Sequence, residues 1–562
     1  MAFVIEIVIL LVVLGLIWRY LGSYLTAVFD GRVHFLDWLE LPLLRLLGIQ
    51  PGSEQSWRRY LRSLLVFSVI SIAITYLLLV FQGHLPLNPQ HLSGLTPALA
   101  FNTAVSFVTN TNWQNYSGGT TMSYLSQMVA LATQNFVSAA VGLAVAIAVI
   151  RGFARKHSGT LGNFWVDTIR GVFYVLLPVS IVMTLVFVWQ GAPQTLLGPA
   201  HIHNVLNGVH QTILRGPVAS QEVIKQLGTN GGGFFNANSA HPFESPTPFT
   251  NFLEIVLILS IPVALTYTFG KMVGNIREGV AVLMAMVILF AGTFAFTLAA
   301  EKGANPAIRA AGITSTHGNM VGKESRFGVN NSVLFDITST QTSTGSVNSS
   351  ADSYTPIGGL GMLAGMMYGE VSPGGIGSGM YTILIFAILT VFIAGLMVGR
   401  TPEYVRKKIQ KTEIIWASIG VLVMPITVLV LTAITVALPG ERAAILNHGP
   451  HGFSEILYAF TSMGNNNGSA FAGLGTNTAY YNIVGAIAML IGRFGVIVPV
   501  MALAGSLAAK EEVPVTAGTF LTATPMFTGL LVGIILLVGA LNFFPAVALG
   551  PIAEAVVHGR FF

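Results

Sequence analysis

The amino-acid sequence predicts an all-α polytopic membrane protein with about ten transmembrane helices. Its 562 residues are 53% hydrophobic and only 9% charged, whereas a soluble chain carries about 25% charged residues. Ten segments are long and apolar enough to cross the roughly 30 Å hydrocarbon core of a bilayer. The segments that join them repeat one pattern four times. Soluble enzymes and nucleic-acid-binding modules are excluded, and the absence of cysteine excludes disulfide scaffolds and zinc-cysteine sites.

Hydropathy alone places the ten predicted spans, each at least about the 20 apolar residues that a membrane helix needs. The spans lie near residues 2–26, 61–82, 123–150, 172–190, 251–271, 279–300, 378–399, 414–437, 479–507 and 523–545. The first span has no basic segment before it, and its first positive charge, Arg19, comes at its far end. We therefore interpret it as a retained helix rather than a signal peptide.

The basic residues divide the connections into two sets. The connections after spans 1, 3 and 7 carry Arg32, Arg45, Arg58, Arg59 and Arg62, then Arg151, Arg155, Lys156 and Arg170, then Arg400, Arg406, Lys407, Lys408 and Lys411. The connection after span 2, residues 83–122, carries none. By the positive-inside rule the basic connections are cytoplasmic, so both termini are expected outside. The net charge of +5 then reflects topology, and no nucleic-acid partner is expected.

The outward connections carry an internal repeat. Each has a short helix-like stretch, beginning at Phe101, Ser220, Asn330 and Phe453, followed by a turn rich in Thr, Ser, Gly and Asn. Equivalent points in the four turns recur roughly every 120 residues, as expected of a repeated unit; they are Gln114, Gly232, Gly345 and Gly468. The predicted units are 59–152, 153–274, 275–400 and 401–510. Residues 1–58 add an N-terminal helix and cytoplasmic loop, and residues 511–562 add a C-terminal helix.

Membrane physics limits what such a unit can do. Non-helical backbone at membrane depth is tolerated only where protein buries it or where it lines a water-filled cavity. Four turns around one axis can aim carbonyl oxygens into a common hole, and glycine permits the close approach that this requires. The short helices would point their negative C-terminal ends at the hole, which favours a cation. Because carbonyl rings replace the hydration shell of potassium in channels, potassium is the leading candidate substrate.

Several other features have two open interpretations. The run Gly374-Gly375-Ile376-Gly377-Ser378-Gly379 has no strand before it, so a helix break or close helix packing is favoured over a dinucleotide loop. Arg493 lies inside a span and is either functional or part of a structural pair. Glu370 has a coordinating or a hydrogen-bonding role. Glu6 and Glu254 lie near span ends, where ordinary interfacial placement is expected.

Nucleotide chemistry is not expected in this chain. It has no P-loop and no Asp-Lys-Thr-Gly phosphorylation sequence. No cytoplasmic connection is longer than about 35 residues, whereas a domain needs about 50 or more. His241 and the other histidines show no metal-ligand spacing. If ATP drives transport, another chain must hydrolyse it.

Long motifs along the whole chain resemble the potassium-binding A subunit of the bacterial Kdp potassium-transporting ATPase. They are TNTNWQ (109–114), GTNGGGFFNAN (228–238), GKESRFG (322–328), GRTPEY (399–404) and NNNGSAFAG (465–473). The resemblance implies the pore-loop fold of the potassium-transporter superfamily, in the lipid of the bacterial inner membrane. It also implies a complex with a P-type ATPase B subunit, a C subunit and a small F subunit. K⁺ would pass through an intramembrane tunnel to the B subunit, which alone uses ATP and Mg²⁺.

The resemblance also implies roles for particular residues. The filter positions fall on Gln114, Gly232, Gly345 and Gly468, with Asn112, Thr229, Asn230, Thr344 and Asn467 as extra ligands. The gate or coupling positions are Gly374, Gly375, Gly377, Arg400 and Arg493, and the segment from Arg400 to Lys411 is a candidate partner contact. One departure is Ser350-Ala351-Asp352, where many relatives read Met-His-Asp, which puts support of the third turn in doubt. Glutamine in the first turn implies a filter without fourfold symmetry.

Two alternative functions differ in class from a pump subunit. One is a self-sufficient potassium symporter or channel with the same pore-loop architecture. The other is an accessory membrane protein whose loops only pack, which the fourfold repeat disfavours.

Overall fold

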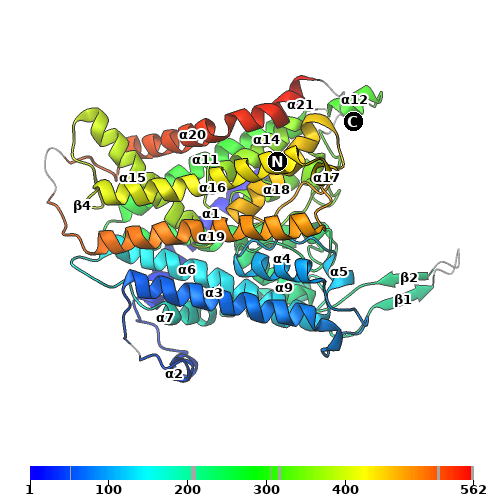
Figure 1. Cartoon of the computed structure of the whole chain (residues 1–562), viewed down its shortest axis with the longest axis horizontal. Helices are drawn as coiled ribbons and strands as arrows, with labels where there is room; N and C mark the ends of the chain where they lie inside the picture. Colours follow the sequence, from blue (N-terminus) through cyan, green and yellow to red (C-terminus); the bar gives the residue numbers. More distant parts are fainter. Residues whose placement is uncertain (51, 204–209, 304, 314–317, 515–518, 558–562) are drawn as a thin grey trace.

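The computed structural model describes the chain except residues 51, 204–209, 304, 314–317, 515–518 and 558–562. Ten helices in the described part are long and apolar enough to cross a membrane, and they run side by side along the horizontal axis of Figure 1. They are α1 (Ala2–Phe29), α3 (Trp57–Val80), α6 (Thr133–Ala154), α7 (Phe164–Arg170) with α8 (Leu177–Trp189), α10 (Pro248–Met272), α11 (Ile276–Lys302), α15 (Ser378–Val398), α16 (Lys411–Ala437), α19 (Ala479–Ala508) and α20 (Pro525–Val547).

These bounds confirm the all-helical polytopic class. The predicted spans agree with the helices to within a few residues when the π-helical turn Ser126–Ala132 is counted with α6. The exception is the fourth, which begins at Phe164 rather than near residue 172. A π-helical turn, Gly171–Leu176, joins its two parts, and a second one, Ser126–Ala132, precedes α6.

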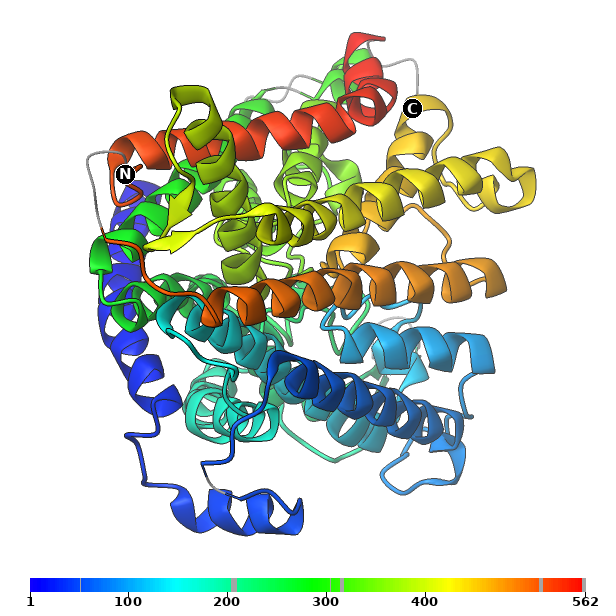
Figure 2. The ribbon, with the colours of Figure 1, turned by 60° about the vertical axis from the view of Figure 1, so that its left-hand side comes forward.

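The spans differ in how much of their surface the protein covers. In the span Ser126–Ala154, 89% of the apolar window is buried, and in Pro248–Met272 the share is 78%, whereas in α1 it is 6%. The first two are therefore central helices, and α1 lies at the edge of the bundle, as Figure 2 shows. Small residues let α6 approach its neighbours closely. A side chain at Gly142, for example, would meet the carbonyl oxygen of Ile376 at 2.4 Å.

Four short helices lie between the spans where the repeat predicted them. They are α4 (Pro97–Val108), α9 (Val218–Leu227), α13 (Gly328–Thr340) and α18 (Gly449–Asn465). We call them the pore helices. The labels α4, α9 and α18 lie in the right-hand half of Figure 1, so these helices enter the bundle from one end without crossing it.

The span after the third pore helix is broken. A short apolar helix, α14 (Pro356–Met367), precedes α15, and residues 368–377 between them are not helical. Gly374 and Gly377 have φ values of +78° and +87°, which L residues with side chains adopt only at a cost. The helix break predicted at this glycine run is therefore present, whereas α14 was not predicted as a separate helix.

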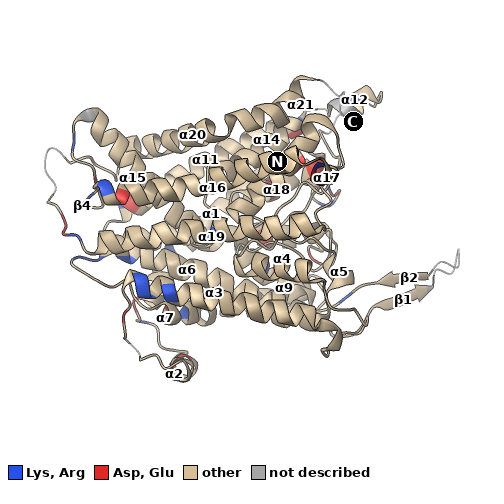
Figure 3. Ribbon diagram, viewed as in Figure 1, with Lys and Arg blue, Asp and Glu red and all other residues tan. Residues whose placement is uncertain are grey.

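The remaining elements are small. They are α2 (Asp37–Leu46), α5 (Gly118–Thr121), α12 (Pro306–Ala310), α17 (Pro439–Arg442), α21 (Ala553–Val556), the hairpin of β1 (Ala200–His203) and β2 (His210–Ile213), and the pair β3 (Glu403–Tyr404) and β4 (Lys407–Lys408). Short 3₁₀ turns at Gln82–His84, Asn238–Ala240 and Ala351–Ser353 and a π-helical turn at Ala548–Ile552 complete the described elements. Figure 3 shows Lys and Arg gathered at the end that holds the start of α3 and β4, opposite the β1–β2 hairpin. This gathering of positive charge at one end agrees with the division of the connections into basic and charge-poor sets in the sequence.

Candidate functional site

The four turns that follow the pore helices share one backbone course. In each turn a backbone N–H donates to the carbonyl five residues back; the pairs are Thr111 to Ser106 (2.9 Å), Asn230 to Lys225 (2.8 Å), Thr344 to Ser339 (3.1 Å) and Asn467 to Ser462 (2.8 Å). The residues on either side of these donors have positive φ values; they are Asn110 and Asn112, Thr229 and Gly231, Ser343 and Gly345, and Asn466 and Gly468. The repeat detected in the sequence is therefore a repeat of backbone geometry.

This hydrogen-bond register fixes which residues correspond. Asn112, Gly231, Gly345 and Gly468 occupy the same place in their turns. The spacing of the sequence repeat instead aligned Gln114 and Gly232 with Gly345 and Gly468. Gln114 lies two residues after Asn112, and Gly232 lies one residue after Gly231. Three of the four structural counterparts are glycine, and the first is asparagine in the left-handed region.

The turns close into a ring. A Cβ atom built on a turn glycine would meet a backbone oxygen of the neighbouring turn; the pairs are Gly231 with Thr344 (1.6 Å), Gly345 with Asn467 (2.2 Å), Gly468 with Thr111 (2.0 Å) and Gly232 with Asn112 (3.2 Å). Each turn thus touches the next, and the fourth touches the first. Only glycine allows the three tightest of these approaches.

The predicted filter residues meet at one cavity. Gln114, Gly232, Gly345 and Gly468 all line a cavity of ≈ 450 Å³. The Gln114 amide spans the first two turns, because its Nε2 donates to the Gly233 carbonyl at 3.0 Å and its Oε1 accepts from the Gly233 N–H at 2.9 Å. The Gln114 side chain therefore braces the second turn from the first.

The neighbouring polar side chains bond the scaffold behind the turns. Asn112 Nδ2 donates to Asn135 Oδ1 at 2.7 Å and to the Gly231 carbonyl at 3.2 Å. Thr229 Oγ1 accepts from the Ile376 N–H at 2.8 Å. The other three residues predicted as extra ligands also have hydrogen-bond partners; they are Asn230 with Asn110, Thr344 with Thr342, and Asn467 with Glu370. Most of these side chains are thus engaged with the scaffold, whereas Asn112 Oδ1 has no hydrogen-bond partner. The turns can therefore present backbone carbonyls and this one amide oxygen.

A buried charge network supports the second turn. Lys225, one helical turn before it, forms ion pairs with Glu222 Oε2 at 2.6 Å and Glu244 Oε2 at 2.5 Å, and its ammonium group donates to Asn238 Oδ1 at 2.9 Å. The Lys225, Glu222 and Glu244 side chains are essentially inaccessible to solvent. Glu244 Oε1 also accepts the Phe235 N–H at 2.7 Å. The network therefore holds both ends of the second turn.

The same network reaches the third turn. Gln226 Nε2 donates to Ser346 Oγ at 2.9 Å and lies 3.5 Å from Glu254 Oε2. Ser346 follows Gly345 directly, and its hydroxyl donates to Asn238 Oδ1 at 3.1 Å. Interfacial placement of Glu254 was a wrong prediction, because its side chain is fully buried beside this network.

The break between α14 and α15 lies directly behind the turns. The Gly374 N–H donates to the carbonyl of Gln341, at the end of the third pore helix, at 2.9 Å. A Cβ on Gly375 would lie 3.0 Å from the Thr342 carbonyl, and one on Gly377 would lie 2.0 Å from the Gly142 carbonyl of α6. Residues 368–377 therefore pack between the turns and a central span.

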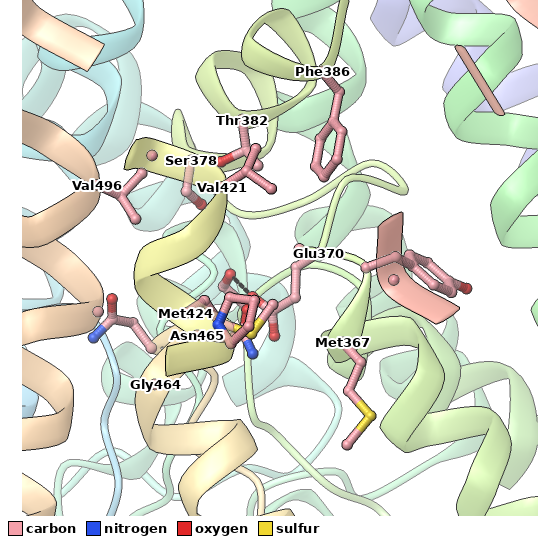
Figure 4. A pocket seen from close by; sticks show the side chains of 18 of the residues that line it. Met367, Glu370, Ser378, Thr382, Phe386, Val421, Met424, Gly464, Asn465 and Val496 are labelled. Carbon is pink, nitrogen blue, oxygen red and sulfur yellow. Dashed lines mark hydrogen bonds between the residues drawn. The ribbon is translucent and has the colours of Figure 1, made fainter. Parts of the chain in front are cut away.

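A second, smaller cavity of ≈ 60 Å³ lies beside this break, and both Glu370 and Arg493 line it. Figure 4 shows Glu370 reaching in between Met367 of α14 and Met424 of α16. Glu370 accepts a hydrogen bond from Ser343 Oγ and one from Asn467 Nδ2, the latter at 2.8 Å. The carboxylate thus connects the third turn to the fourth.

The two arginines predicted as gate or coupling residues lie in different places. Arg493 of α19 is buried, and its Nη2 donates to the Ser138 carbonyl of α6 at 3.2 Å. Arg400 is exposed beyond the end of α15 and donates to the Thr519 carbonyl at 3.2 Å. Arg493 belongs to the cavity, whereas Arg400 belongs to the basic end of the molecule.

A charged cluster holds the fourth pore helix at its outer end. His451 lies 3.0 Å from Asp352 Oδ1 through Nε2 and 2.9 Å from Glu554 Oε1 through Nδ1. Burial alone would lower the pKa of His451, but these two carboxylates outweigh it and raise the pKa to about 10. Asp352, which this chain shares with the Met-His-Asp pattern, is thus the residue that contacts His451. The different residues at Ser350 and Ala351 leave this support of the fourth pore helix intact.

Asp352, His451 and Glu455 each offer a ligand atom within 4.8 Å of the others, as a metal site would require. The imidazole of His451, however, holds a proton on each ring nitrogen when it bonds two carboxylates, and an imidazolium has no lone pair for a metal. The cluster is better described as an ion-paired clasp between the third outer loop, α18 and α21.

We predict that the stabilising effect of this clasp depends on pH. Because the folded pKa of about 10 exceeds the ordinary 6.5, the stabilisation is fully present below pH 6.5 and is lost as pH rises towards 10. His451→Gln should destabilise the protein by about 2 kcal/mol below pH 6.5 and much less at pH 10. Thermal unfolding at both pH values measures this difference. His84→Gln, at an exposed outer histidine, is the control, and an equal effect of His451→Gln at both pH values would contradict the prediction.

Three site features were not predicted from the sequence. They are the Lys225 network, the Asp352–His451–Glu554 clasp and the cross-turn bond of Gln114. The clasp and the Gln114 bond join residues from different connections, and the Lys225–Glu244 pair joins residues 19 apart within one connection. The charged residues inside a predicted pore helix, Glu222 and Lys225, were the one available signal for the network, because charges at that depth must be paired.

Comparisons with known proteins agree with this geometry. A family model described as potassium-transporting ATPase A subunit matches residues 7–556. Proteins named potassium-transporting ATPase potassium-binding subunit from Mesorhizobium japonicum and Laribacter hongkongensis are 53% and 52% identical to the chain, covering 99% and 97% of both sequences. The potassium transporter TrkH from Vibrio parahaemolyticus has a similar fold, with a TM-score of 0.53 at 15% identity over 88% of this chain and 96% of its own. The chain therefore belongs to the potassium-transporting ATPase A subunit family.

Proposed function

We propose that this chain is the potassium-binding and translocating subunit of an ATP-driven potassium import pump. The observation that carries the proposal is the closed ring of four glycine-rich turns around one cavity. Relatives more than 50% identical are named for potassium binding. In this proposal the partner chain, a P-type ATPase B subunit, uses ATP and Mg²⁺, and a C subunit and a small F subunit complete the complex.

We propose that the backbone carbonyls of the ring select K⁺. The turns supply oxygens at Asn112, Gly231, Gly345 and Gly468, with Gln114 and Gly232 at the cavity wall. Carbonyl dipoles that replace a hydration shell favour a dehydrated monovalent cation, and the four pore helices direct their negative ends at it. Unequal residues at the four positions make this filter asymmetric.

The route beyond the filter is proposed to turn sideways. Residues 368–377 block the straight path inward, with Gly374, Gly375 and Gly377 as the positions that allow the break to move. The ≈ 60 Å³ cavity between α15, α16, α19 and α20 is large enough for a few water-sized groups and starts the tunnel to the B subunit. Glu370 and Arg493 set the charge along it. Arg400 and its basic neighbours contact the partner.

We further propose a bacterial inner-membrane location with both termini outside, because the basic end of the molecule then faces the cytoplasm. Residues 59–152, 153–274, 275–400 and 401–510 are the four repeat units of this proposal, flanked by the additions 1–58 and 511–562. Each unit contains one of the pore helices described above.

Reconstitution in potassium-loaded vesicles tests the pump-subunit proposal. The chain assembled with its partner subunits should move K⁺ only when ATP is supplied, and a partner unable to be phosphorylated should abolish this transport. The isolated chain should show no sustained selective flux. Sustained K⁺ flux through the isolated chain, unaffected by ATP, would favour the self-sufficient symporter or channel instead.

A further inference from the structure

One face of α3 is exposed along its whole length. Its large apolar residues recur every three or four positions, as one helix face requires, and each is between 49% and 66% exposed; they are Val66, Val69, Ile70, Ile74, Leu77 and, just past the helix, Phe81. In a membrane protein such a face meets lipid tails. The same spacing continues towards the start of the helix and reaches Arg62 and Arg59, with Arg58 beside them. A lipid-facing stripe thus ends in three arginines.

These arginines surround a hollow. A space of ≈ 560 Å³ is lined by Ser56, Arg58, Arg59, Arg62, Ser63, Val66 and Trp165. Trp165 comes from α7, and its ring is held edge-on against Phe67 of α3, with centroids 5.6 Å apart. The hollow therefore has basic and hydroxyl groups at one end, an aromatic side wall and an apolar exit onto the stripe.

The three arginines differ from their neighbours in charge pairing. Within the described residues, Arg58, Arg59 and Arg62 form no ion pair, whereas Arg151 pairs with Asp167 at 2.6 Å and Arg155 with Glu54 at 2.7 Å. Arg58 instead lies over the Trp57 ring at 5.3 Å. Three exposed guanidinium groups without a carboxylate partner at one site can pair with an anion from outside the chain.

We propose that this hollow binds the phosphate headgroup of an anionic phospholipid from the cytoplasmic leaflet. Guanidinium groups pair with phosphate oxygens in a fork geometry, and the indole of Trp165 suits the headgroup level of a bilayer. An acyl chain of the same molecule lies on the stripe from Val66 towards Phe81. A lipid satisfies both halves of the site, whereas inorganic phosphate satisfies only the basic half. The proposal is independent of the ion route, which lies in the centre of the bundle.

Lipid retention by the assembled complex tests the proposal. The complex is equilibrated in nanodiscs containing phosphatidylglycerol, cardiolipin and phosphatidylcholine, extracted, and analysed for co-purifying lipid by native mass spectrometry. The wild type should retain an anionic lipid in preference to phosphatidylcholine. The variant R58Q/R59Q/R62Q should reduce this preference at least about tenfold, since each basic group adds to the attraction. Millimolar inorganic phosphate should not displace the lipid.

A matched control separates a site from general surface charge. The variant R45Q/K271Q/R277Q also removes three exposed positive charges but leaves the hollow and the segment from Arg400 to Lys411 intact, and its lipid retention should equal that of the wild type. Equal loss in both triple variants, or displacement by inorganic phosphate, would overturn the proposal. So would anionic-lipid retention that is unchanged by R58Q/R59Q/R62Q in a folded complex, because a partner protein would then cover the arginines.

Discussion

Replacing Gly345 with serine is expected to weaken the apparent potassium affinity of the assembled pump by about tenfold or more. Gly345 has a φ of +72°, and a Cβ atom there would lie 2.2 Å from the Asn467 carbonyl oxygen and 2.7 Å from the Ser469 nitrogen. The third turn must therefore move away from the fourth, which displaces carbonyls from the ring. Potassium dependence of ATP-driven transport measures the affinity, and competition by Rb⁺ and Na⁺ measures the selectivity.

Substitutions at two further glycines test whether the loss of potassium affinity grows as the contact between turns becomes closer. Gly468→Ser should act as strongly, because its Cβ would lie 2.0 Å from the Thr111 carbonyl, whereas Gly232→Ser should act less, since its nearest atoms lie at 3.2 Å. Gly274 is the control, because it has a φ of +78° but no atom within 4 Å of its Cβ position. Gly274→Ser strains the backbone without touching the ring. Unchanged affinity and selectivity for Gly345→Ser in a folded complex would remove this turn from the filter.

Replacing Lys225 with methionine is expected to have the second large effect, a loss of about 3–5 kcal/mol of stability together with weaker potassium affinity. The substitution leaves the Glu222 and Glu244 carboxylates buried without the ammonium group that lies 2.5 to 2.6 Å from them. Protonation of the acids, or movement of the second turn, must then relieve the unpaired charge. Thermal unfolding and the potassium dependence of transport measure the two effects.

A second variant keeps this prediction testable if Lys225→Met fails to fold. Adding Glu244→Gln removes one of the uncompensated charges and should restore part of the stability, while the amide can still accept the Phe235 N–H. Asp167→Asn, in the buried Arg151–Asp167 pair at the basic end, is the matched control. It should lower stability and leave potassium affinity unchanged. Equal affinity losses in Lys225→Met and Asp167→Asn would show that the network has no particular link to the filter.

The sequence predicted the spans and the pore helices well for physical reasons. A membrane helix needs about 20 apolar residues regardless of its neighbours, so hydropathy alone locates the ten spanning helices closely. The pore helices were found because one pattern recurs four times in charge-poor connections. The break before α15 was found because glycines such as Gly374 and Gly377 mark positive φ.

Features that depend on contacts between distant segments were not predictable in the same way. The period aligned Gln114 with Gly345, whereas the backbone hydrogen bonds align Asn112 with it. Glu254 looks interfacial in the sequence, because its place near a span end does not show that Gln226 lies beside it. The partners of His451 come from positions 99 and 103 residues away. Hydropathy shows that a helix lies in an apolar environment, but it does not show which polar side chains of another segment will contact that helix.

Locating the bound ion tests the central claim most directly. A structure of the complex containing Rb⁺ or Tl⁺ in place of K⁺ allows the ion to be found by its anomalous signal. We expect a peak on the axis of the ring, within coordination distance of backbone carbonyls from all four turns, including those at Gly345 and Gly468. Ion density confined to the cavity of Glu370 and Arg493, with none inside the ring, would contradict selection by the four turns.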